Sequence, residues 1–400
     1  MRVAIPDRTV VRTLIVLAVT QLIGWGSVGQ LTVIGSQVAA DLHMSAAAVF
    51  AGNSILYVTM GVCAPPLGKL FVRFGARRVM IAGTMLAVPG FALLANADGP
   101  VRYFAAWVIL GMAGSATLTT AAYIMLNEIA GDAAKSAIGA LMLVTGLSSS
   151  IFWPTTACLS GLVGWRMGCL VYAGSLILVS LPLNAFGLPR RPRSPQGQPP
   201  DQRADDGDVR ARGTFYLIVS AIALNAFVTI GFSAVMIELL KAIGLSPAEA
   251  IGFGSLLGVL QVSARGLDFL GGGRWDGIAT GLVAGTALPL AMLLLMAGRG
   301  AHWSIAGFII VYGLGSGALA VARATIPLAF YDKDAYARAA SHIALPLNVI
   351  AAASPPLMAG MLAHFGGKSV LCLAMFCSCS ALLVLLRLGR RRPVKSAIGA

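Results

Sequence analysis

The sequence PLGKLFVRFGARR, residues 66–78, separates two long apolar stretches of this 400-residue chain. It holds four Lys and Arg residues, two glycines and no acid. The stretches on either side lie near Ala46–Lys69 and Val79–Leu94, and a helix that crosses a bilayer takes about 20 mostly apolar residues. A short basic loop between two such helices predicts a protein that crosses a membrane more than once.

The composition of the whole chain agrees with this prediction. Residues of the set AVILMFWYC make up 58% of the chain, charged residues make up 11%, and the mean hydropathy is +0.84. Ordinary soluble domains contain about 45–50% apolar and about 25% charged residues. So few charged side chains could not cover the surface of a water-soluble protein, whereas bilayer hydrocarbon requires no such cover. The composition therefore excludes a soluble globular protein.

Apolar runs of spanning length recur along the whole chain. They lie near Val11–Val38, Ala46–Lys69, Val79–Leu94, Val101–Asn127, Ala137–Val163, Met167–Phe186, Thr214–Leu240, Pro247–Leu270, Ile278–Met296, Trp303–Ile326, Ile343–Ala363 and Ser369–Leu388. These twelve runs predict an all-α membrane protein with twelve transmembrane helices. The first run is too long for a secretory signal and lacks a cleavage site of small residues, so it is assigned to helix 1.

One polar segment divides the chain. Residues 189–213 are rich in Pro, Gln, Arg and Asp and show no apolar periodicity. They are predicted to form a cytoplasmic linker between an N-terminal six-helix bundle, residues 1–188, and a C-terminal six-helix bundle, residues 214–388. Residues 389–400 are predicted to form a basic cytoplasmic tail. A plain tether explains the composition of the linker, and a regulatory or partner-binding role is the alternative.

The cationic residues indicate how the chain is oriented. The formal net charge is +14, from 29 Lys and Arg against 15 Asp and Glu. With both termini inside the cell, 23 of the 29 cations fall in cytoplasmic segments, 5 fall in the opposite loops, and Arg265 lies within a helix. Because cytoplasmic loops carry the excess of Lys and Arg, this distribution predicts cytoplasmic termini. The charge is therefore assigned to orientation, and no nucleic-acid partner is expected.

The two halves of the chain repeat each other. At a constant offset of 202 residues, Gly111, Asp132, Pro154 and Gly164 fall on Gly313, Asp334, Pro356 and Gly366. At an offset of 198 residues, Gly68 and Gly75 fall on Gly266 and Gly273. An even number of helices in each half returns the chain to the cytoplasmic side, so the halves share one orientation and are pseudo-symmetric. Transporters built in this way rock one half against the other.

Residues 66–78 resemble a signature of the major facilitator superfamily, Gly-x-Leu-x-Asp-Arg-x-Gly-x-Arg, which lies in the loop between helices 2 and 3. The resemblance extends to the twelve predicted spans, the two repeats and the polar central segment, and it implies the major facilitator fold. It also implies a cytoplasmic gate motif made of Gly68, Arg73, Gly75 and Arg77. Val72 stands where the signature has its acid, so the inward-closed state is predicted to be weaker or to be locked elsewhere.

Four further segments are similar to a bacterial subgroup of this superfamily that includes relatives of monocarboxylate porters. They are residues 146–154, 164–166, 261–265 and 322–329. Trp153 occupies a position in the fifth helix where many drug antiporters have Gly. The resemblance therefore implies a carrier of the bacterial inner membrane and disfavours multidrug export.

The family resemblance also implies that helices 1, 4, 7 and 10 line a central cavity. The large or polar side chains of these helices are therefore candidate substrate ligands: Trp25, Gln30, Tyr123, Asn225, Tyr312 and Arg323. A large or amide side chain needs a partner in hydrocarbon, which favours a functional role. Hydroxyl side chains in the same helices more often bond to their own helical turn or join helices together.

Arg265 and Asp268 are notable because a charged side chain inside a membrane span is costly. They are three residues apart and can pair on one face of helix 8. In one interpretation they form a gate pair that replaces the acid missing at Val72. In the other, Arg265 binds a carboxylate of the substrate, because a guanidinium group matches a carboxylate bidentately. Resemblance to monocarboxylate porters implies this second role, although the acid precedes the arginine in those porters and follows it here.

A proton-coupled carrier needs a group that exchanges protons. Asp268, Glu238 and His342 are the candidates, with Glu128 as a further acid. His342 has the alternative of being simply solvated near the cytoplasmic side. The spans contain few acids for a proton antiporter, which favours symport of a proton with an anion and leaves facilitated diffusion as the alternative.

These patterns predict secondary active transport by alternating access, with proton-coupled uptake of a small organic anion, such as a monocarboxylate, as the specific hypothesis. Export of small amphipathic compounds is the alternative. A membrane-embedded enzyme is a remote one, because no nucleophile, base or acid cluster can be assembled within the spans. The four histidines make no metal-ligand spacing, so neither a metal nor a cofactor is expected. The expected partners are the substrate, a proton and the lipid bilayer, and the carrier is predicted to be a monomer.

Overall fold

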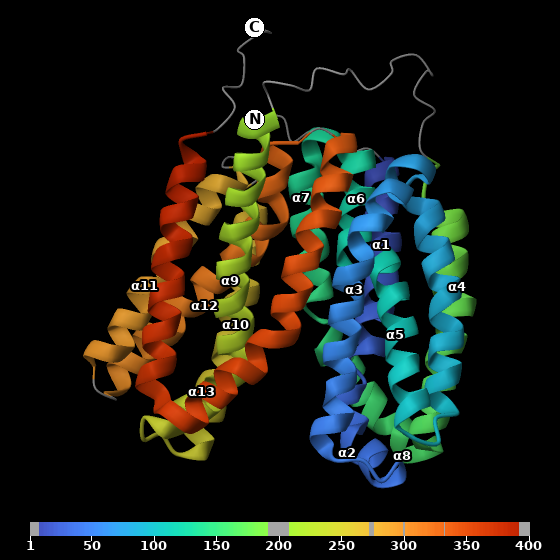
Figure 1. Cartoon of the computed structure of the whole chain (residues 1–400), viewed down its shortest axis with the longest axis horizontal. Coiled ribbons are helices and arrows are strands. Elements are labelled where there is room, and N and C mark those ends of the chain that lie inside the picture. Colours follow the sequence, from blue (N-terminus) through green and yellow to red (C-terminus); the bar gives the residue numbers. More distant parts are fainter. Residues whose placement is uncertain (1–7, 191–207, 272–275, 299–300, 332, 392–400) are drawn as a thin grey trace, which may run out of the picture. The chain divides into compact units, whose positions relative to one another are not determined.

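A computed structural model describes residues 8–190, 208–271, 276–298, 301–331 and 333–391 of the chain (Figure 1). Within these ranges the chain is almost entirely helical and contains no β-strand. The predicted all-α fold is therefore confirmed. Residues 191–207 of the predicted linker and residues 392–400 of the predicted tail lie outside the described ranges.

The chain forms two compact units. One unit contains Met1–Pro192 and Lys333–Ala352, and the other contains Arg193–Asp332 and Ala353–Ala400. The domain bounds inferred from the sequence, at residues 188, 213 and 388, remain predictions.

The first unit contains eight helices and three short helical turns: α1 (Arg8–Val28), α2 (Leu31–Asp41), α3 (Ala46–Phe74), α4 (Ala76–Ala95), α5 (Pro100–Thr117), α6 (Thr119–Ala130), η1 (Gly131–Ala133), α7 (Ala134–Thr145), α8 (Ser148–Ser175), η2 (Leu176–Ser180) and η3 (Leu183–Gly187). The described part of the second unit contains α9 (Asp208–Ala242), α10 (Pro247–Leu270), α11 (Gly277–Ala297), α12 (His302–Thr325) and η4 (Ile326–Ala329). The last helix, α13 (Lys333–Gly389), begins in the first unit and ends in the second.

Nine helical stretches among the described residues are long and apolar enough to cross a membrane. Two of them, Ala134–Gly187 and Ala335–Gly389, contain 54 and 55 residues. A straight helix of that length would extend about 80 Å, whereas bilayer hydrocarbon is about 30 Å thick. Each stretch is interrupted by a glycine with a non-helical backbone, Gly164 in the first and Gly366 in the second. These lengths are consistent with twelve spans, and the count itself remains a prediction.

The two interrupting glycines are one of the repeat pairs seen in the sequence. Gly164 has φ 79° and ψ 162°, and Gly366 has φ 76° and ψ 175°, a conformation almost confined to glycine. Close to Gly164, Arg166 forms an ion pair with Asp41 (2.7 Å) and donates to the backbone carbonyl of Ala97 (2.8 Å). The turn at Gly164 is thereby tied to the ends of α2 and α4.

A second repeat pair, Gly111 of α5 and Gly313 of α12, lies where helices pack closely. A Cβ atom at Gly111 would lie 2.6 Å from the Cβ of Thr59, and one at Gly313 would lie 2.7 Å from the Cβ of Leu260. Glycine therefore lets α5 approach α3, and α12 approach α10, at corresponding points of the two units. This matching packing confirms the pseudo-symmetric halves inferred from the sequence repeat.

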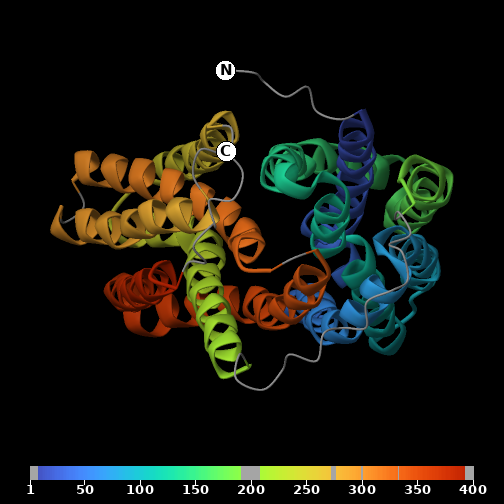
Figure 2. The ribbon, with the colours of Figure 1, turned by 90° about the horizontal axis from the view of Figure 1, so that it is seen from above.

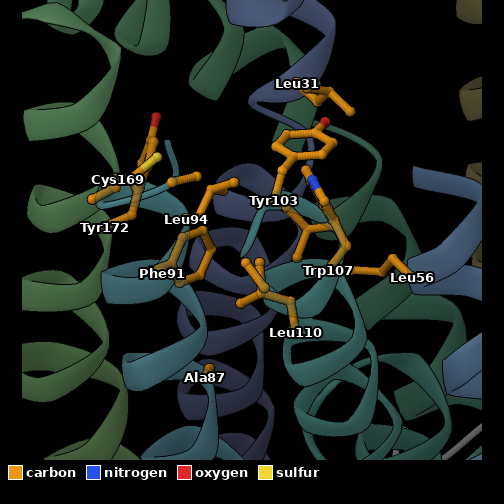
Figure 3. Packing of buried hydrophobic residues seen from close by; sticks show 14 of the residues in the cluster. Leu31, Leu56, Ala87, Phe91, Leu94, Tyr103, Trp107, Leu110, Cys169 and Tyr172 are labelled. Carbon is orange, nitrogen blue, oxygen red and sulfur yellow. The ribbon is translucent and has the colours of Figure 1, made fainter. Parts of the chain in front are cut away.

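The core of the first unit is built around α5, which packs against α3 and α4. Tyr103 and Trp107 of α5 are fully buried and lie beside each other, with Leu56 of α3 next to Trp107 (Figure 3). The Tyr103 hydroxyl donates to the backbone carbonyl of Val49 on α3 (2.6 Å). The core therefore contains large rings whose polar tip is satisfied by the backbone, as burial requires.

The core of the second unit lies between α9, α11 and α12. Figure 2 shows α11 and α12 side by side, in gold and orange. The Phe232 ring of α9 lies 6.0 Å from the Phe308 ring and 5.5 Å from the Tyr312 ring of α12, measured between centroids. These three fully buried rings join α9 to α12.

Gly164→Ala is expected to lower the free energy of unfolding by about 1–3 kcal/mol, because alanine must adopt a backbone conformation almost confined to glycine. Gly161→Ala, in the same helix, is the matched control. A Cβ atom meets nothing within 4 Å at either position, and only Gly164 has a positive φ. The control is expected to leave stability unchanged or to raise it by about 0.5–1 kcal/mol. Thermal unfolding in one detergent measures both, and equal melting temperatures would contradict the assignment of strain to Gly164.

Candidate functional site

A cavity of about 300 Å³ lies in the first unit, between α1, α2, α3, α7 and α8. Its aromatic wall residues are Trp25, Phe50, Tyr57 and Trp153. The polar wall residues include Asn53, Thr145 and Ser148, and none of the residues that line it is charged. This aromatic cavity therefore offers flat apolar rings together with amide and hydroxyl groups.

Two helix breaks border the aromatic cavity. Gly29 lies between the end of α1 and the start of α2, and it lines the cavity. Thr145 ends α7 and Ser148 begins α8, and both line the cavity. Non-helical backbone is tolerated at membrane depth where protein or a cavity surrounds it, and discontinuous helices form the binding sites of many carriers. The breaks and the cavity together define the candidate site of the first unit.

Trp25, predicted as a substrate ligand, lies at this cavity. Its indole Nε1 donates to the hydroxyl of Thr119 (3.1 Å), and its ring lies 6.4 Å from the ring of Tyr57. This hydrogen bond uses the single polar group of the indole, so the ring itself is left for contact with a ligand. The predicted contact with substrate remains a prediction.

The structure does not bring Gln30 and Tyr123 to the wall of the aromatic cavity. Gln30 is 1% exposed and accepts a weak hydrogen bond from the thiol of Cys169 (3.7 Å), so its side chain lies in the packed core of the first unit. Tyr123 of α6 is half-buried and interacts electrostatically with Tyr336 of α13. Their predicted roles in substrate binding remain predictions.

A second cavity, of about 370 Å³, lies in the second unit between α10, α11 and α12. Asp268 and Thr280 are its polar wall residues, and the other wall residues are apolar or glycine. The Thr280 hydroxyl donates to Oδ1 of Asp268 (2.8 Å), and Asp268 is 8% exposed. Arg265, about one turn earlier on α10, is half-buried and does not line this cavity. The predicted pairing of Arg265 with Asp268 remains a prediction.

The other predicted ligands of the second unit lie on α9 and α12. Tyr312 is fully buried, and its ring stacks on Phe308 at a centroid distance of 5.4 Å. Asn225 of α9 is buried, and Arg323 is half-buried in the last turn of α12. None of these three predicted ligands lines the aromatic cavity or the cavity beside Asp268.

The three candidate proton carriers differ in burial. Glu238 is exposed and forms an ion pair with Lys241 on the same helix (2.8 Å), which is the geometry of an ordinary surface pair. His342 of α13 is exposed. Asp268 alone among the three is buried. Burial favours Asp268 as the group whose protonation would depend on the state of the carrier.

The predicted gate motif lies at the junction of α3 and α4. Gly75 joins the two helices with φ 77° and ψ 154°, again a conformation almost confined to glycine. Arg77 donates from its guanidinium to the backbone carbonyl of Ala185, which ties α4 to η3. Arg73 is exposed and lies over the ring of Phe74 at 5.1 Å. The two arginines thus have different surroundings.

Gly68, the remaining gate residue, lies where α3 meets the α13 residues of the same unit. A Cβ atom at Gly68 would lie 3.0 Å from the Cβ of Ser341, and one at Gly61 would lie 3.0 Å from the carbonyl oxygen of Leu345. Gly61 and Gly68 are two helical turns apart on one face of α3. Their missing side chains allow close approach of the two backbones.

Glu128 of α6 contributes to the gate motif although the signature does not include it. Its two carboxylate oxygens accept from the backbone amide of Ala76 at 3.3 and 3.4 Å. Ala76 is the first residue of α4, where unpaired amides and the helix dipole favour an anion. An acid from another helix therefore contacts the motif that lacks its own acid at Val72.

Asn53 and Tyr57 of α3 are cavity residues that the sequence reasoning missed. It assigned the cavity to helices 1, 4, 7 and 10, and α3 belongs to none of these. A signal was present, since Asn53 and Tyr57 are four residues apart in an apolar run and so share a helix face. Polar side chains at that spacing inside a span indicate a lined cavity.

The described residues include no group of three or more His, Cys, Asp and Glu side chains that could hold a metal ion. The wall residues of the aromatic cavity are instead apolar, aromatic, amide and hydroxyl groups. Such groups bind a solute without covalent chemistry.

The model of the Major Facilitator Superfamily matches residues 14–295 of the chain. The match covers more than half of the chain, and the chain belongs to the major facilitator superfamily. This is a family of multi-pass membrane transporters rather than enzymes. No curated protein matches the chain by sequence.

Solved structures share the fold over nearly the whole chain. The human organic anion transporter MFSD10 (TETRAN) is 15% identical, with a TM-score of 0.71 over 95% of this chain and 100% of that chain. The proton:xylose symporter XylE is 14% identical, with a TM-score of 0.72 over 97% of each chain. The E. coli fucose:proton symporter FucP, in the outward conformation, is 13% identical, with a TM-score of 0.73 over 95% of this chain and 99% of that chain. At these identities the likeness shows the fold alone.

Proposed function

We propose that the chain is a secondary active carrier that moves a small organic solute across the membrane by alternating access. The aromatic cavity carries this proposal, because it lies against two broken helices and combines aromatic rings with amide and hydroxyl groups. Its volume of about 300 Å³ suits a small organic molecule. Membership of the major facilitator superfamily supports the same function.

We infer that the substrate is a small organic anion of the monocarboxylate class with an apolar or aromatic body. The rings of the aromatic cavity suit such a body, but its wall residues include no cation that could bind a carboxylate. Arg265 is our candidate for that role, because it is half-buried within α10 and its guanidinium can form two parallel hydrogen bonds to a carboxylate. Organic anion and sugar carriers share the fold, so side chains must choose the substrate.

We propose that uptake is coupled to a proton carried by Asp268. This carboxylate is buried, and the Thr280 hydroxyl holds one of its oxygens. A proton that travels with an organic anion offsets the anion's charge, which reduces the cost of moving it through a region of low dielectric constant. Two carriers of the same fold are proton symporters.

The proposed location is the bacterial inner membrane, with both termini in the cytoplasm. The excess of Lys and Arg in the segments assigned to the cytoplasm supports this orientation. The proposed functional form is a monomer. Export of a small amphipathic compound is a second candidate function, because the uncharged aromatic cavity also suits neutral amphiphiles.

Arg265→Ala and Arg265→Lys are expected to weaken carboxylate uptake by about 10- to 100-fold in apparent affinity, because hydrogen bonds to charged groups contribute about 1.5–3 kcal/mol. Arg102→Ala is the control, since Arg102 is exposed and pairs only with Asp98 in the described structure (2.7 Å). Uptake of labelled lactate, pyruvate and benzoate into cells that contain equal amounts of each variant measures the effect. Unchanged uptake of every carboxylate would exclude the anion hypothesis.

Tyr57→Ala is expected to reduce uptake at least tenfold, because it removes one ring from the wall of the aromatic cavity and a buried aromatic contact contributes about 1.5–3 kcal/mol. Tyr216→Ala is the matched control, since Tyr216 of α9 is 65% exposed and lines no cavity described above. The same uptake assay, combined with the reverse assay of efflux from preloaded cells, measures both variants. Equal transport by the two variants would show that the aromatic cavity does not bind the substrate.

Asp268→Asn is expected to abolish the response of uptake to a pH gradient, because an amide does not exchange a proton near neutral pH. Glu238→Gln removes an exposed carboxylate that is already paired with Lys241, and it is expected to keep the response. Reconstituted vesicles with an imposed gradient, acidic outside, measure the initial rate with and without a protonophore. A wild-type rate that is indifferent to the gradient would exclude proton symport, and a gradient response retained by Asp268→Asn would exclude Asp268.

A further inference from the structure

A third helix break in the first unit lies between α5 and α6. α5 ends at Thr117, α6 begins at Thr119, and Leu118 between them has φ −83° and ψ −153°, which is extended rather than helical. The amide of Leu118 still donates to Gly114 (2.8 Å), and the amide of Ala122 donates to Leu118 (3.1 Å). Backbone groups between these two bonds leave the regular helical ladder, and inside a bilayer the protein itself must supply their partners.

One face of α1 contacts this break at three successive positions. Nε2 of Gln21 donates to the carbonyl of Thr117 (2.7 Å). Nε1 of Trp25 donates to the hydroxyl of Thr119 (3.1 Å). A Cβ atom at Gly24 would come within 2.8 Å of Cδ2 of Leu118, so a larger residue there would push α1 away from the break. Gln21, Gly24 and Trp25 have the spacing i, i+3, i+4 of one helix face, and together they are called the α1 clamp.

Gln21 is held in place for this role. It is 1% exposed, and its amide lies against the break rather than on the wall of the aromatic cavity. A buried amide that donates to a backbone carbonyl freed from the helix replaces the lost intrahelical bond at that carbonyl. The break between α5 and α6 is thus stabilised from α1, and its geometry depends on where α1 lies.

Trp25 belongs both to the α1 clamp and to the aromatic cavity. Its ring lies on the cavity wall, while its N–H bonds to the first residue of α6. Any solute that presses on or shifts this ring therefore acts on the hydrogen bond to Thr119. The aromatic cavity and the start of α6 share one rigid side chain.

The far end of α6 reaches the gate motif. Glu128 lies nine residues after Thr119, which corresponds to about 14 Å along a helix at about 1.5 Å per residue. Its carboxylate accepts from the amide of Ala76, directly after the positive-φ residue Gly75. A single helix of 12 residues therefore connects the cavity at one end with the gate motif at the other.

We propose that Gln21 and Thr119 are positioning residues that set the angle of α6 at the Leu118 break, so that contact with a solute at Trp25 moves α6 and alters the hold of Glu128 on the first turn of α4. The transport role of this device rests on the proposed function, in which the aromatic cavity binds the substrate. The clamp and its connection to the gate motif are properties of the unliganded chain and can be measured without a substrate.

Hydrogen–deuterium exchange of the full chain in lipid nanodiscs tests the proposal. Gln21→Met and Thr119→Val each remove one hydrogen bond at the break with little change of shape. Each is expected to raise exchange about tenfold in residues 119–122 and also in residues 76–79, the change that corresponds to losing about 1.4 kcal/mol. Thr119→Ser keeps the hydroxyl and is expected to exchange like the wild type.

Gln261→Met is the matched control. Nε2 of Gln261 donates to the hydroxyl of Ser316 (3.0 Å), which is also an amide bond between two helices, but α12 is unbroken at Ser316. This variant is expected to leave exchange in both segments of the first unit unchanged. Faster exchange confined to residues 119–122 would overturn the connection to the gate motif. Unchanged exchange, or a rise spread evenly over all helices, would overturn the positioning role altogether.

A double-mutant cycle tests the clamp without relying on either single variant. Trp25→Phe keeps the ring and removes the N–H, and Thr119→Val removes its acceptor. If the two groups act through their mutual hydrogen bond, the double variant is expected to exchange no faster than the faster single variant. Additive effects would overturn the proposal. The outcome is separate from the proposed function, which fails if Tyr57→Ala leaves transport intact whatever the exchange pattern is.

Discussion

The absence of water inside a bilayer is the constraint on which this structure depends. A backbone group that leaves the helical ladder there has no solvent partner, so the protein must provide one. The first unit nevertheless breaks its helices near Gly29, Leu118 and Gly146. At Leu118 the partners come from Gln21 and Trp25 of α1. Because each break must be satisfied from a neighbouring helix, the breaks also fix which helices lie together and where.

The second constraint concerns how helices associate in lipid. Lipid tails are as apolar as leucine, so close packing and hydrogen bonds rather than burial from water hold the helices together. Glycine supplies that closeness: a Cβ atom at Gly52 would lie 2.5 Å from Nε1 of Trp107, and Gly68 and Gly111 are similarly tight against their neighbours. The gate motif follows the same logic, since Gly68 serves the packing of α3 and Gly75 serves the turn into α4.

The sequence predicted the helical fold, the repeat and the family because each rests on a pattern that the bilayer imposes: apolar length, glycine spacing and the distribution of cations. It did not predict the cavity residues Asn53 and Tyr57, because periodicity shows that two residues share a face but not what that face meets. It also placed Gln30 with the ligands, although an amide in hydrocarbon needs a partner of any kind and Gln30 lies against Cys169 in the core. Which partner a polar side chain finds depends on tertiary packing, and a single sequence does not contain that information in local form.

The two units differ in the chemistry that they bury. The cavity of the first unit is lined by aromatic, amide and hydroxyl groups, whereas Arg265, Asp268 and Arg323 all belong to the second unit. Burial of a charge is costly in any part of a membrane protein, so a chain that concentrates such charges in one half keeps them for a reason other than stability. Recognition of a solute's body and recognition of its charge are different physical tasks, since the first needs rigid rings and the second needs a guanidinium or a carboxylate in a region of low dielectric constant. The repeat that made the two halves alike in fold has therefore left them free to differ in the kind of group that they offer.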